Sequence, residues 1–345
     1  MTHLSRHPKA ICSYSGGSDS DIMIDLIEHA RQIIPTLPKV KYVFFDTGLE
    51  MEATKRHVRE TAEKYGVEIE TCRPKKNIVL STKEHGLPWM SKIVSTAMET
   101  VQKKEVPFEI ADEYAACETD EERKAKREEL RERYPKAETA INFLCECDSA
   151  GNPRPGIQLS VGSSPFLLDF FKETPPTFRM SATCCVDCKK NLAHAVQKDY
   201  EMVITGERRD EGGMRSVPRS GDANQSMCFS QTSSGQYRFR PLYYVSDADK
   251  AWYKEWRRIR YSDAYEVYGL KRTGCCGCSI SARAVADLEI IGRYEPNIKK
   301  AAWHVFGESY RYRQAYEDYK RRRYEEQKNG NQTTFFDELE WGKKQ

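Results

Sequence analysis

The feature that most constrains this chain is a glycine turn, Ser15-Gly16-Gly17-Ser18-Asp19-Ser20, between a strand-like segment and an amphipathic helix. We expect the strand over residues 9–14, and apolar residues recur at helical spacing over residues 21–34. Amide groups at a helix N-terminus lack partners and carry partial positive charge, so such a turn can bind phosphate. Glycines let the backbone approach the phosphate, and serine hydroxyls add donors. The alternative is an ordinary turn with a serine or aspartate helix cap.

The order of the expected elements predicts the fold class. Strands at 40–45, 67–71 and 201–205 and a helix at 52–65 follow the first strand and helix. Alternating strands and helices are typical of a parallel sheet with right-handed crossovers. We therefore predict an α/β fold, a parallel sheet with helices on both faces, plus a mostly helical C-terminal region. The predicted domains are 1–245, with a helical insertion at about 85–160, and 246–345, which carries the second cysteine cluster.

Charge and hydropathy set limits on partners and location. The 345 residues include 55 basic and 52 acidic side chains, so there is no global signal for binding a polyanion, and a nucleic-acid partner is neither demanded nor excluded. No apolar run approaches the roughly 20 residues that a bilayer-spanning helix needs, and no leader pattern precedes the first strand. We expect a cytoplasmic protein with no membrane partner. A homodimer is compatible with the sequence.

Twelve cysteines are concentrated in clusters. A secreted disulfide scaffold fits this clustering poorly, and clustered thiols in a reducing compartment indicate metal or redox chemistry. Soft thiolates favour iron–sulfur clusters or zinc, tandem cysteines are unusual for zinc, and plain thiols are the third alternative. The two main clusters are Cys184, Cys185, Cys188 and Cys275, Cys276, Cys278. A site role is the less favoured interpretation for Cys145 and Cys147, and Cys12, Cys72, Cys117 and Cys228 are expected to be structural.

Several motifs carry a resemblance to a known superfamily. The Ser15–Ser20 turn resembles the SGGxDS loop of the N-type ATP pyrophosphatases, and Phe45-Asp46-Thr47-Gly48-Leu49-Glu50 resembles the DTGxE segment of their sulfonucleotide (PAPS/APS) reductase branch. Residues 205–211 with Arg215 look like the G-x-R-x-x-E…R segment, and residues 241–252 are similar to PLxxW–DVW, with Val245 in place of Trp. The resemblance implies a Rossmann-like PP-loop sheet of the HUP type. It also implies that a nucleotide contacts Ser15, Gly16, Gly17, Ser18, Asp19, Ser20, Asp46, Thr47, Gly48 and Gly206.

The cysteine clusters extend this resemblance. Residues 184–189, CCVDCK, look like the CCxxRK motif of iron–sulfur APS reductases with Cys188 replacing Arg, and residues 275–278 match its second half. The resemblance implies a 4Fe–4S cluster bound by Cys184, Cys185, Cys275 and Cys278, with Cys188 as the alternative ligand. Cys276 and Cys188 then remain as thiols that can carry a persulfide. Lys189 and Lys190 follow the first cluster and can lower nearby thiol pKa values.

The reductases use a cysteine in a C-terminal tail, whereas no cysteine follows Cys278 here. We therefore expect an ATP-dependent sulfurtransferase, similar to the thiolating members that act on tRNA and in DNA phosphorothioation. The loop would hold ATP with Mg²⁺, and Asp19 would orient the loop or help bind Mg²⁺. Arg208 and Arg215 would neutralise developing charge. The expected partners are a sulfur donor such as a cysteine desulfurase and a nucleic-acid or nucleotide acceptor. The alternatives are a sulfonucleotide reductase with a displaced thiol, and a non-catalytic nucleotide- or nucleic-acid-binding module that uses residues 311–323.

Overall fold

The computed structural model describes residues 2–148, 150–152, 164, 166–211 and 227–341. The chain divides into two compact units. Unit 1 consists of Met1–Leu80, Cys185–Gly277 and Val285–Ala302, and unit 2 consists of Ser81–Cys184, Cys278–Ala284 and Trp303–Gln345. The predicted insertion at 85–160 lies within unit 2. The predicted domain boundary at residue 245 lies within the Cys185–Gly277 segment of unit 1, and the predicted domain division stays a prediction.

Unit 1 is built on a six-stranded sheet with the order β3-β2-β1-β4-β6-β5. The strands are β1 (Ala10–Ser13), β2 (Lys41–Phe45), β3 (Ile69–Cys72), β4 (Met202–Ile204), β5 (Phe229–Gln231) and β6 (Tyr237–Phe239). All neighbouring pairs are parallel except β5 and β6, which are antiparallel. The predicted parallel sheet is confirmed, whereas the β5–β6 pair was not predicted. In this order β2 is the neighbour of β1 on one side and β4 is its neighbour on the other. The direction in which strands are added therefore reverses between β1 and β4, which makes this position a topological switch point.

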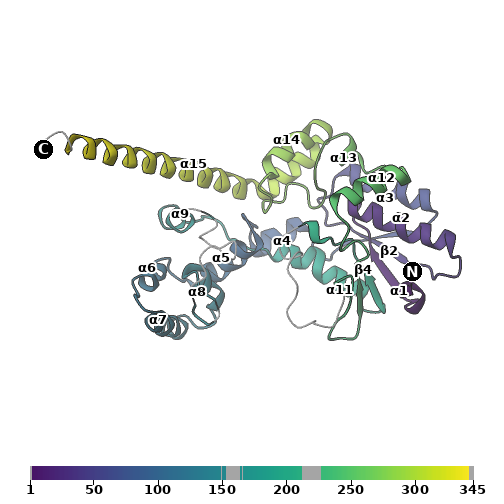
Figure 1. Ribbon diagram of the computed structural model, residues 1–345, viewed down its shortest axis with the longest axis horizontal. Helices are drawn as coiled ribbons and strands as arrows, with labels where there is room; N and C mark the ends of the chain where they lie inside the picture. Colours follow the sequence, from purple (N-terminus) through teal and green to yellow (C-terminus); the bar gives the residue numbers. More distant parts are fainter. Residues whose placement is uncertain (1, 149, 153–163, 165, 212–226, 342–345) are drawn as a thin grey trace. The chain divides into compact units, whose positions relative to one another are not determined.

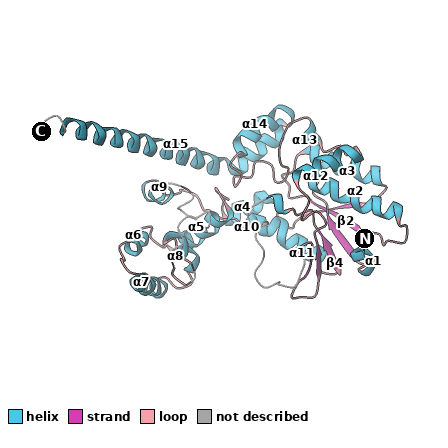
Figure 2. Cartoon of the chain, viewed as in Figure 1, coloured by secondary structure: helices cyan, strands magenta, loops and turns pink. Residues whose placement is uncertain are grey.

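The two faces of the sheet carry separate apolar clusters, as the alternation of side chains along a strand requires. On one face Tyr42 and Ile204 pack with Ile22 and Ile27 of α2 (Ser18–Ile33). On the other face a smaller cluster that includes Ile11 and Val203 packs against partly buried side chains of α11 (Asn191–Gln197). Figure 1 labels both helices beside the strands, and Figure 2 shows the strands in magenta. Helices on both faces are therefore confirmed.

The remaining helices of unit 1 begin and end where their sequences supply caps. α3 (Glu52–Tyr65) ends at Gly66, which adopts a left-handed conformation with φ +62°. α12 (Asp247–Arg257) begins with a capping box formed by Ser246 and Asp249. The other segments are α1 (Thr2–Arg6), α13 (Asp263–Glu266), the π-helical turn Val186–Lys190 and the 3₁₀ turn Arg209–Glu211. Four of the described helices cross unit boundaries: α4 (Ile78–His85), α10 (Thr183–Cys185), α14 (Ala284–Tyr294) and α15 (Pro296–Trp341).

Unit 2 is helical. It contains α5 (Lys92–Lys104), α6 (Ile110–Ala115), α7 (Asp120–Arg133), α8 (Glu138–Leu144), α9 (Leu167–Glu173) and most of α15 (Pro296–Trp341). Its core gathers aromatic side chains, with Trp89, Phe170 and Tyr316 almost completely buried. In α7 the buried residues are Arg127 and Leu130, as expected for a solvated charged helix. Among the described helices, none has the length and apolarity needed to cross a bilayer.

Candidate functional site

The glycine turn lies where β1 meets α2, at the sheet edge where β2 and β4 also end. Gly17 is the N-cap residue of α2, and Gly16 adopts a left-handed conformation with φ +66°. A Cβ on Gly16 would lie 2.9 Å from Thr54 Cγ2 of α3, and one on Gly17 would lie 3.2 Å from Thr273 Oγ1. Both glycines therefore let the turn pack closely against the rest of unit 1. This packing role is additional to the predicted approach of backbone to phosphate.

The serines at the two ends of the turn hold its shape. Ser20 Oγ donates to the Gly17 carbonyl at 2.7 Å and accepts from the Gly17 N–H at 3.0 Å. Ser15 Oγ lies 3.2 Å from Ser20 Oγ. The N–H groups of Ser18 and Asp19 belong to the first turn of α2, where no intrahelical acceptor exists. Backbone amides of the first turn are thus the groups that suit an anion.

Asp19 forms ion pairs beside this helix N-terminus. Its Oδ1 lies 2.7 Å from Arg208 Nε and 2.7 Å from Lys250 Nζ. The same Lys250 ammonium donates to Ser18 Oγ at 2.6 Å. Arg208 is 5% exposed and also donates to Asp247 Oδ1 at 2.7 Å. Burial lowers the pKa of Arg208, but its hydrogen bonds to Asp247 and Asp19 and the negative charges of these carboxylates outweigh burial and raise the pKa above its ordinary value.

This geometry suits the alternative in which Asp19 orients the loop, because two cations already neutralise its carboxylate. The Mg²⁺ role of Asp19 stays a prediction. Gly206 follows β4, and a Cβ there would lie 3.5 Å from the Asp19 carbonyl carbon, so the predicted residues Gly206, Arg208 and Asp19 come together. Arg215 lies outside the described residues. The sequence did not predict a site role for Lys250, which follows Asp247 and Asp249 in the first turn of α12.

The DTG segment follows β2 at the same sheet edge. Asp46 Oδ1 accepts from the Gly48 N–H at 3.0 Å, and its Oδ2 accepts from Arg73 Nε at 3.1 Å. Thr47 donates to Glu50 Oε1 at 2.8 Å and lies 3.5 Å from Cys275 Sγ. The segment therefore connects the sheet edge to the second cysteine cluster. Arg73 was not among the predicted residues.

Members of both predicted cysteine clusters lie in unit 1: Cys185 and Cys188 from the first cluster, and Cys275 and Cys276 from the second. Cys188 lies in the π-helical turn Val186–Lys190, and Cys185 is the N-cap residue of that turn. Lys189 donates a hydrogen bond to Cys275 and also faces Glu50. The Cys276 N–H donates to the Leu49 carbonyl at 2.7 Å, which fixes this cluster to the DTG segment. Thiols of both predicted clusters belong to unit 1, and sulfur is the donor that a soft metal group prefers.

Burial raises the pKa values of three of these thiols. It raises the pKa values of Cys188 and Cys276 to about 12. Burial also raises the pKa of Cys275, while the Lys189 ammonium opposes that increase. The pKa of Lys189 itself is raised by Cys275 and Glu50 in spite of burial. A thiol with a raised pKa is a weak nucleophile at neutral pH, because little of it is present as the thiolate. Cys188 and Cys276 therefore need a metal, a bound persulfide sulfur or a partner to increase their reactivity.

The four predicted cluster ligands are divided between the units. Cys185 and Cys275 belong to unit 1, whereas Cys184 and Cys278 belong to unit 2. Among the described residues, no group of three or more His, Cys, Asp or Glu side chains is arranged to hold a metal ion. All twelve cysteines are free thiols in this structure. The four-cysteine ligand set and its Cys188 variant stay predictions.

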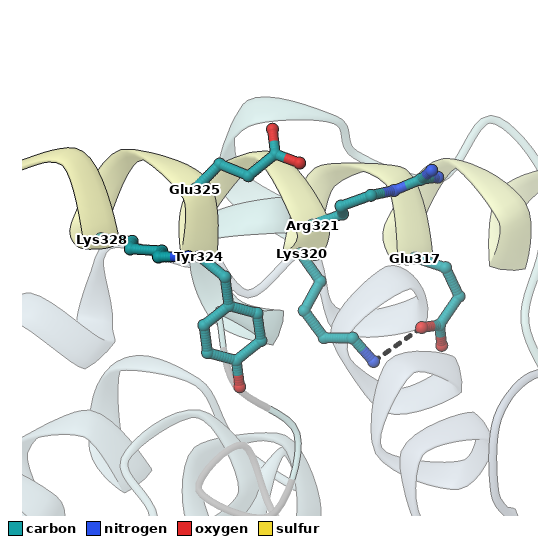
Figure 3. A pocket seen from close by; sticks show the side chains of 6 residues that line it. All are labelled: Glu317, Lys320, Arg321, Tyr324, Glu325 and Lys328. Carbon is teal, nitrogen blue, oxygen red and sulfur yellow. Dashed lines mark ion pairs between the residues drawn. The ribbon is translucent and has the colours of Figure 1, made fainter.

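Two cavities lie apart from these residues. One, of about 490 Å³, is an open face of α15 lined by Glu317, Lys320, Arg321, Tyr324, Glu325 and Lys328 (Figure 3). Its charges are locally paired, with Glu317 Oε2 2.7 Å from Lys320 Nζ, as expected for a solvated helix. The other, of about 140 Å³ in unit 1, includes Asp21 and His57 in its wall. Neither cavity is lined by a predicted catalytic, nucleotide-binding or metal-binding residue, whereas Glu317, Lys320 and Arg321 belong to the segment 311–323 of the alternative nucleic-acid-binding module.

The chain matches a known protein family over most of its length. The sequence model of the phosphoadenosine phosphosulfate reductase domain matches residues 9–281. No curated protein matches the chain. Among solved structures, the chain is similar to phosphoadenylyl-sulfate (PAPS) reductase from Candida auris in a phosphate complex, with 14% identity, TM-score 0.37, and coverage of 78% of this chain and 81% of that chain. It is also similar to U34-tRNA thiolase NcsA from Methanococcus maripaludis with its 4Fe–4S cluster, with 12% identity, TM-score 0.34, and coverage of 92% and 74%.

Proposed function

Because the chain belongs to the phosphoadenosine phosphosulfate reductase domain family, we propose that it is an ATP-dependent sulfurtransferase. It transfers the adenylyl group of ATP to a substrate oxygen, releases pyrophosphate, and lets sulfur displace AMP. The observation that carries this proposal is the charge-balanced glycine turn: Asp19 is neutralised by Arg208 and Lys250 at the N-terminus of α2. A helix terminus freed of nearby negative charge suits the phosphates of a nucleotide.

In the first step the substrate oxygen attacks the α-phosphorus. A new P–O bond forms as the bond to the β-phosphate oxygen breaks, and pyrophosphate leaves with that electron pair. The first-turn amides of α2 and Lys250 hold the phosphates in line, which supplies positioning and charge neutralisation. Mg²⁺, when bound, supplies further neutralisation of the phosphate oxygens.

In the second step sulfur replaces the activated oxygen. The terminal sulfur of a persulfide attacks the carbon that bears the adenylated oxygen, so a C–S bond forms and the C–O bond breaks as AMP leaves. A dithiol reductant then cleaves the S–S bond that joins this sulfur to the carrier cysteine, which releases the thiolated product and the carrier thiol while the dithiol becomes a disulfide. Cys276 and Cys188 are the proposed persulfide carriers, loaded by a donor such as a cysteine desulfurase. The proposed ligands of a 4Fe–4S cluster are Cys184, Cys185, Cys275 and Cys278, with Cys188 as the alternative ligand. Such a cluster would offer an iron to sulfur only if three of these thiols bind it. Lys189 holds Cys275 by a hydrogen bond and balances the Glu50 carboxylate.

The test is nucleotide turnover by anaerobically purified protein. With ATP labelled on the α-phosphate, we expect AMP and pyrophosphate in the presence of sulfur donor and acceptor. Lys250→Met removes a cation that contacts Ser18 and Asp19, and we expect AMP release to fall about 10²-fold. Lys254→Met is the matched control on the same helix, since Lys254 Nζ pairs with Glu266 at 2.8 Å. Release of ADP, or an equal effect of the two variants, would overturn the proposal.

The second candidate is a sulfonucleotide reductase, which the matched family model favours by its description. Such an enzyme would release sulfite from APS or PAPS with thioredoxin as reductant and without ATP. Sulfite release under these conditions, with no AMP formed from ATP, would select the reductase.

A further inference from the structure

Two hydroxyl groups from a later part of unit 1 lie beside Gly17, within the glycine turn. A Cβ on Gly17 would lie 3.2 Å from Thr273 Oγ1 and 3.4 Å from the Tyr265 hydroxyl oxygen. These two oxygens are 3.2 Å apart, so the side chains share one hydrogen bond. Tyr265 belongs to α13, and Thr273 lies in the segment that leads to the second cysteine cluster. We call Tyr265 and Thr273 the hydroxyl pair.

The hydroxyl pair lies where the side chain of a helix cap would lie. Gly17 is the N-cap residue of α2 and has no side chain, whereas the usual N-cap residues carry an oxygen beyond Cβ that accepts from the first-turn amides. Both oxygens of the pair are within 3.4 Å of the position of that Cβ. They therefore lie on the side of Gly17 from which a capping oxygen reaches the amides. An anion bound to these amides comes within reach of both hydroxyls.

One proton of the hydroxyl pair is left to donate. Two hydroxyls carry two protons, and the hydrogen bond between them uses one. Within the part of the chain that the structure describes, each hydroxyl has only the other as its hydrogen-bond partner. Tyr265 and Thr273 are both half-buried, so a ligand at the glycine turn can reach this remaining O–H group.

We propose that the hydroxyl pair binds the pyrophosphate part of ATP, together with the first-turn amides of α2 and Lys250. A phosphate oxygen accepts several hydrogen bonds, and those to a charged acceptor are stronger than those between neutral groups. Lys250 reaches the same turn, where its ammonium donates to Ser18 Oγ at 2.6 Å. The proposal rests on the proposed function, which puts the phosphates of ATP at the glycine turn. It adds that residues from 265–273 contact these phosphates from the side opposite α2.

The same segment brings the nucleotide close to the thiols. Gly274 follows Thr273 with φ +147°, a conformation that favours glycine, and Cys275 comes next. Two residues of chain span about 7 Å at most, so the Cα atoms of Thr273 and Cys275 are no farther apart than that. Cys275 Sγ in turn lies 3.5 Å from Thr47 Oγ1. A phosphate that contacts Thr273 is therefore held beside the proposed sulfur site, which favours transfer of sulfur by proximity.

The experiment measures binding of inorganic pyrophosphate and of ATP to the full chain by titration calorimetry, with Mg²⁺ and without sulfur donor or acceptor. Tyr265→Phe combined with Thr273→Val removes both hydroxyls but keeps the ring and the branched shape. We expect this double variant to bind both ligands about 10-fold more weakly, since it loses hydrogen bonds to a charged group. Thr273→Val alone should weaken binding in the same direction. Thr273→Ser retains the hydroxyl and should keep the native affinity.

Tyr268→Phe is the matched control, because the Tyr268 hydroxyl donates to Glu295 Oε1 at 3.0 Å. This variant should bind pyrophosphate as the native chain does. Three results would overturn the proposal: native affinity in the double variant, equal losses in Thr273→Ser and Thr273→Val or in Tyr268→Phe and the double variant, and no binding of pyrophosphate to the native chain.

Binding and turnover separate this proposal from the proposed function. If pyrophosphate binding depends on the hydroxyl pair but ATP yields ADP or no AMP, the sulfurtransferase proposal fails and the hydroxyl pair stands. If ATP yields AMP while the double variant binds pyrophosphate with native affinity, the role of the hydroxyl pair fails and the sulfurtransferase proposal stands.

Discussion

Gly16 illustrates how one residue can serve both folding and binding. It combines φ +66° with a position where a Cβ would lie 2.9 Å from Thr54 Cγ2. We predict that Gly16→Ala lowers the free energy of unfolding by about 2–3 kcal/mol, since a left-handed alanine costs about 1–2 kcal/mol and the contact adds to it. Nucleotide binding should weaken as the turn shifts. Urea unfolding and nucleotide titration calorimetry measure the two effects.

Gly66 is the matched control for this substitution. Its φ of +62° is nearly the same, but a Cβ there would meet nothing within 4 Å. Gly66→Ala should therefore cost only the conformational part, about 1–2 kcal/mol, and leave nucleotide affinity unchanged. Equal losses of stability in the two variants, with binding intact in both, would contradict the close packing of Gly16.

The sequence allowed part of this residue-level arrangement to be predicted. The Ser15–Ser20 turn could be placed because a strand and an amphipathic helix flank it, and Asp46 and Thr47 because they follow the next strand. Lys250 could not be found, since its contact with Asp19 joins positions more than 200 residues apart and no local pattern encodes it. The contact of Gly16 with Thr54 depends on how α3 packs, which helical periodicity does not specify.

At the scale of elements, Asp25 joins three helices of unit 1. This α2 residue is 2% exposed and accepts from Tyr65 of α3 at 2.9 Å and from Tyr253 and Arg257 of α12 at 2.8 and 2.9 Å. Burial raises the pKa of Asp25, but hydrogen bonds from Arg257, Tyr253 and Tyr65 outweigh it and lower the pKa below its ordinary value. The carboxylate therefore stabilises the packing of α2, α3 and α12 while it is ionised.

We predict that Asp25→Asn lowers the free energy of unfolding by about 1.5–3 kcal/mol at pH 7, the usual range for hydrogen bonds to a charged group. Because the pKa in the folded state is depressed, this contribution is present above the unfolded pKa of about 3.9 and disappears as the pH falls through the folded value. The difference between native chain and variant should thus shrink below about pH 4. Urea titrations at a series of pH values measure it.

The comparison for Asp25 is Glu60→Gln on α3. Glu60 pairs with Arg56 at 3.8 Å, and both side chains are about half exposed. Exposed pairs contribute little, so this variant should change the free energy of unfolding by less than about 0.5 kcal/mol. A difference for Asp25→Asn that is the same at pH 7 and pH 3 would show that its effect is not that of the ionised carboxylate.

The elements that could be predicted are those whose apolar residues recur with a clear helical or strand periodicity. Residues 52–65 and the first three strands have long enough apolar patterns, and α2 was predicted at 21–34 against an observed Ser18–Ile33. The strands β5 and β6 have three residues each, too short for an alternation to be seen. The π-helical turn that carries Cys188 also has no sequence signature, although such turns often occur at functional sites.

At the scale of the whole molecule, the division into units could not be seen in the sequence. The family match ends at residue 281, but the core of unit 2 includes Tyr312, Tyr316 and Tyr319 of α15. Their partners, among them Trp89 and Phe170, come from the segment that precedes residue 185. Periodicity identifies a helix and its apolar face, but it does not say which distant segment covers that face.

This arrangement predicts the effect of shortening the chain. Truncation after Ala302 removes the three tyrosines, whose rings lie within 6 Å of Trp89 or Phe170: Tyr312 and Tyr316 at 5.1 and 5.9 Å from Trp89, and Tyr319 at 5.4 Å from Phe170. Each large core deletion costs about 3–5 kcal/mol, so the sum approaches or exceeds the whole stability of a typical domain. We expect amide hydrogens of α5, α6, α7, α8 and α9 to lose protection from exchange, while those of β1, β2 and α2 keep it.

Hydrogen exchange with mass spectrometry measures this segment by segment, and truncation after Lys328 is the control because it leaves all three tyrosines in place. The control should keep the native protection of α5, α6, α7, α8 and α9, since the aromatic core of unit 2 is intact. If the shorter truncation also leaves that protection unchanged, α15 does not complete the core. If protection is lost equally from β1 and from α5, the two units unfold as one, and the stability of the nucleotide site depends on the C-terminal helix.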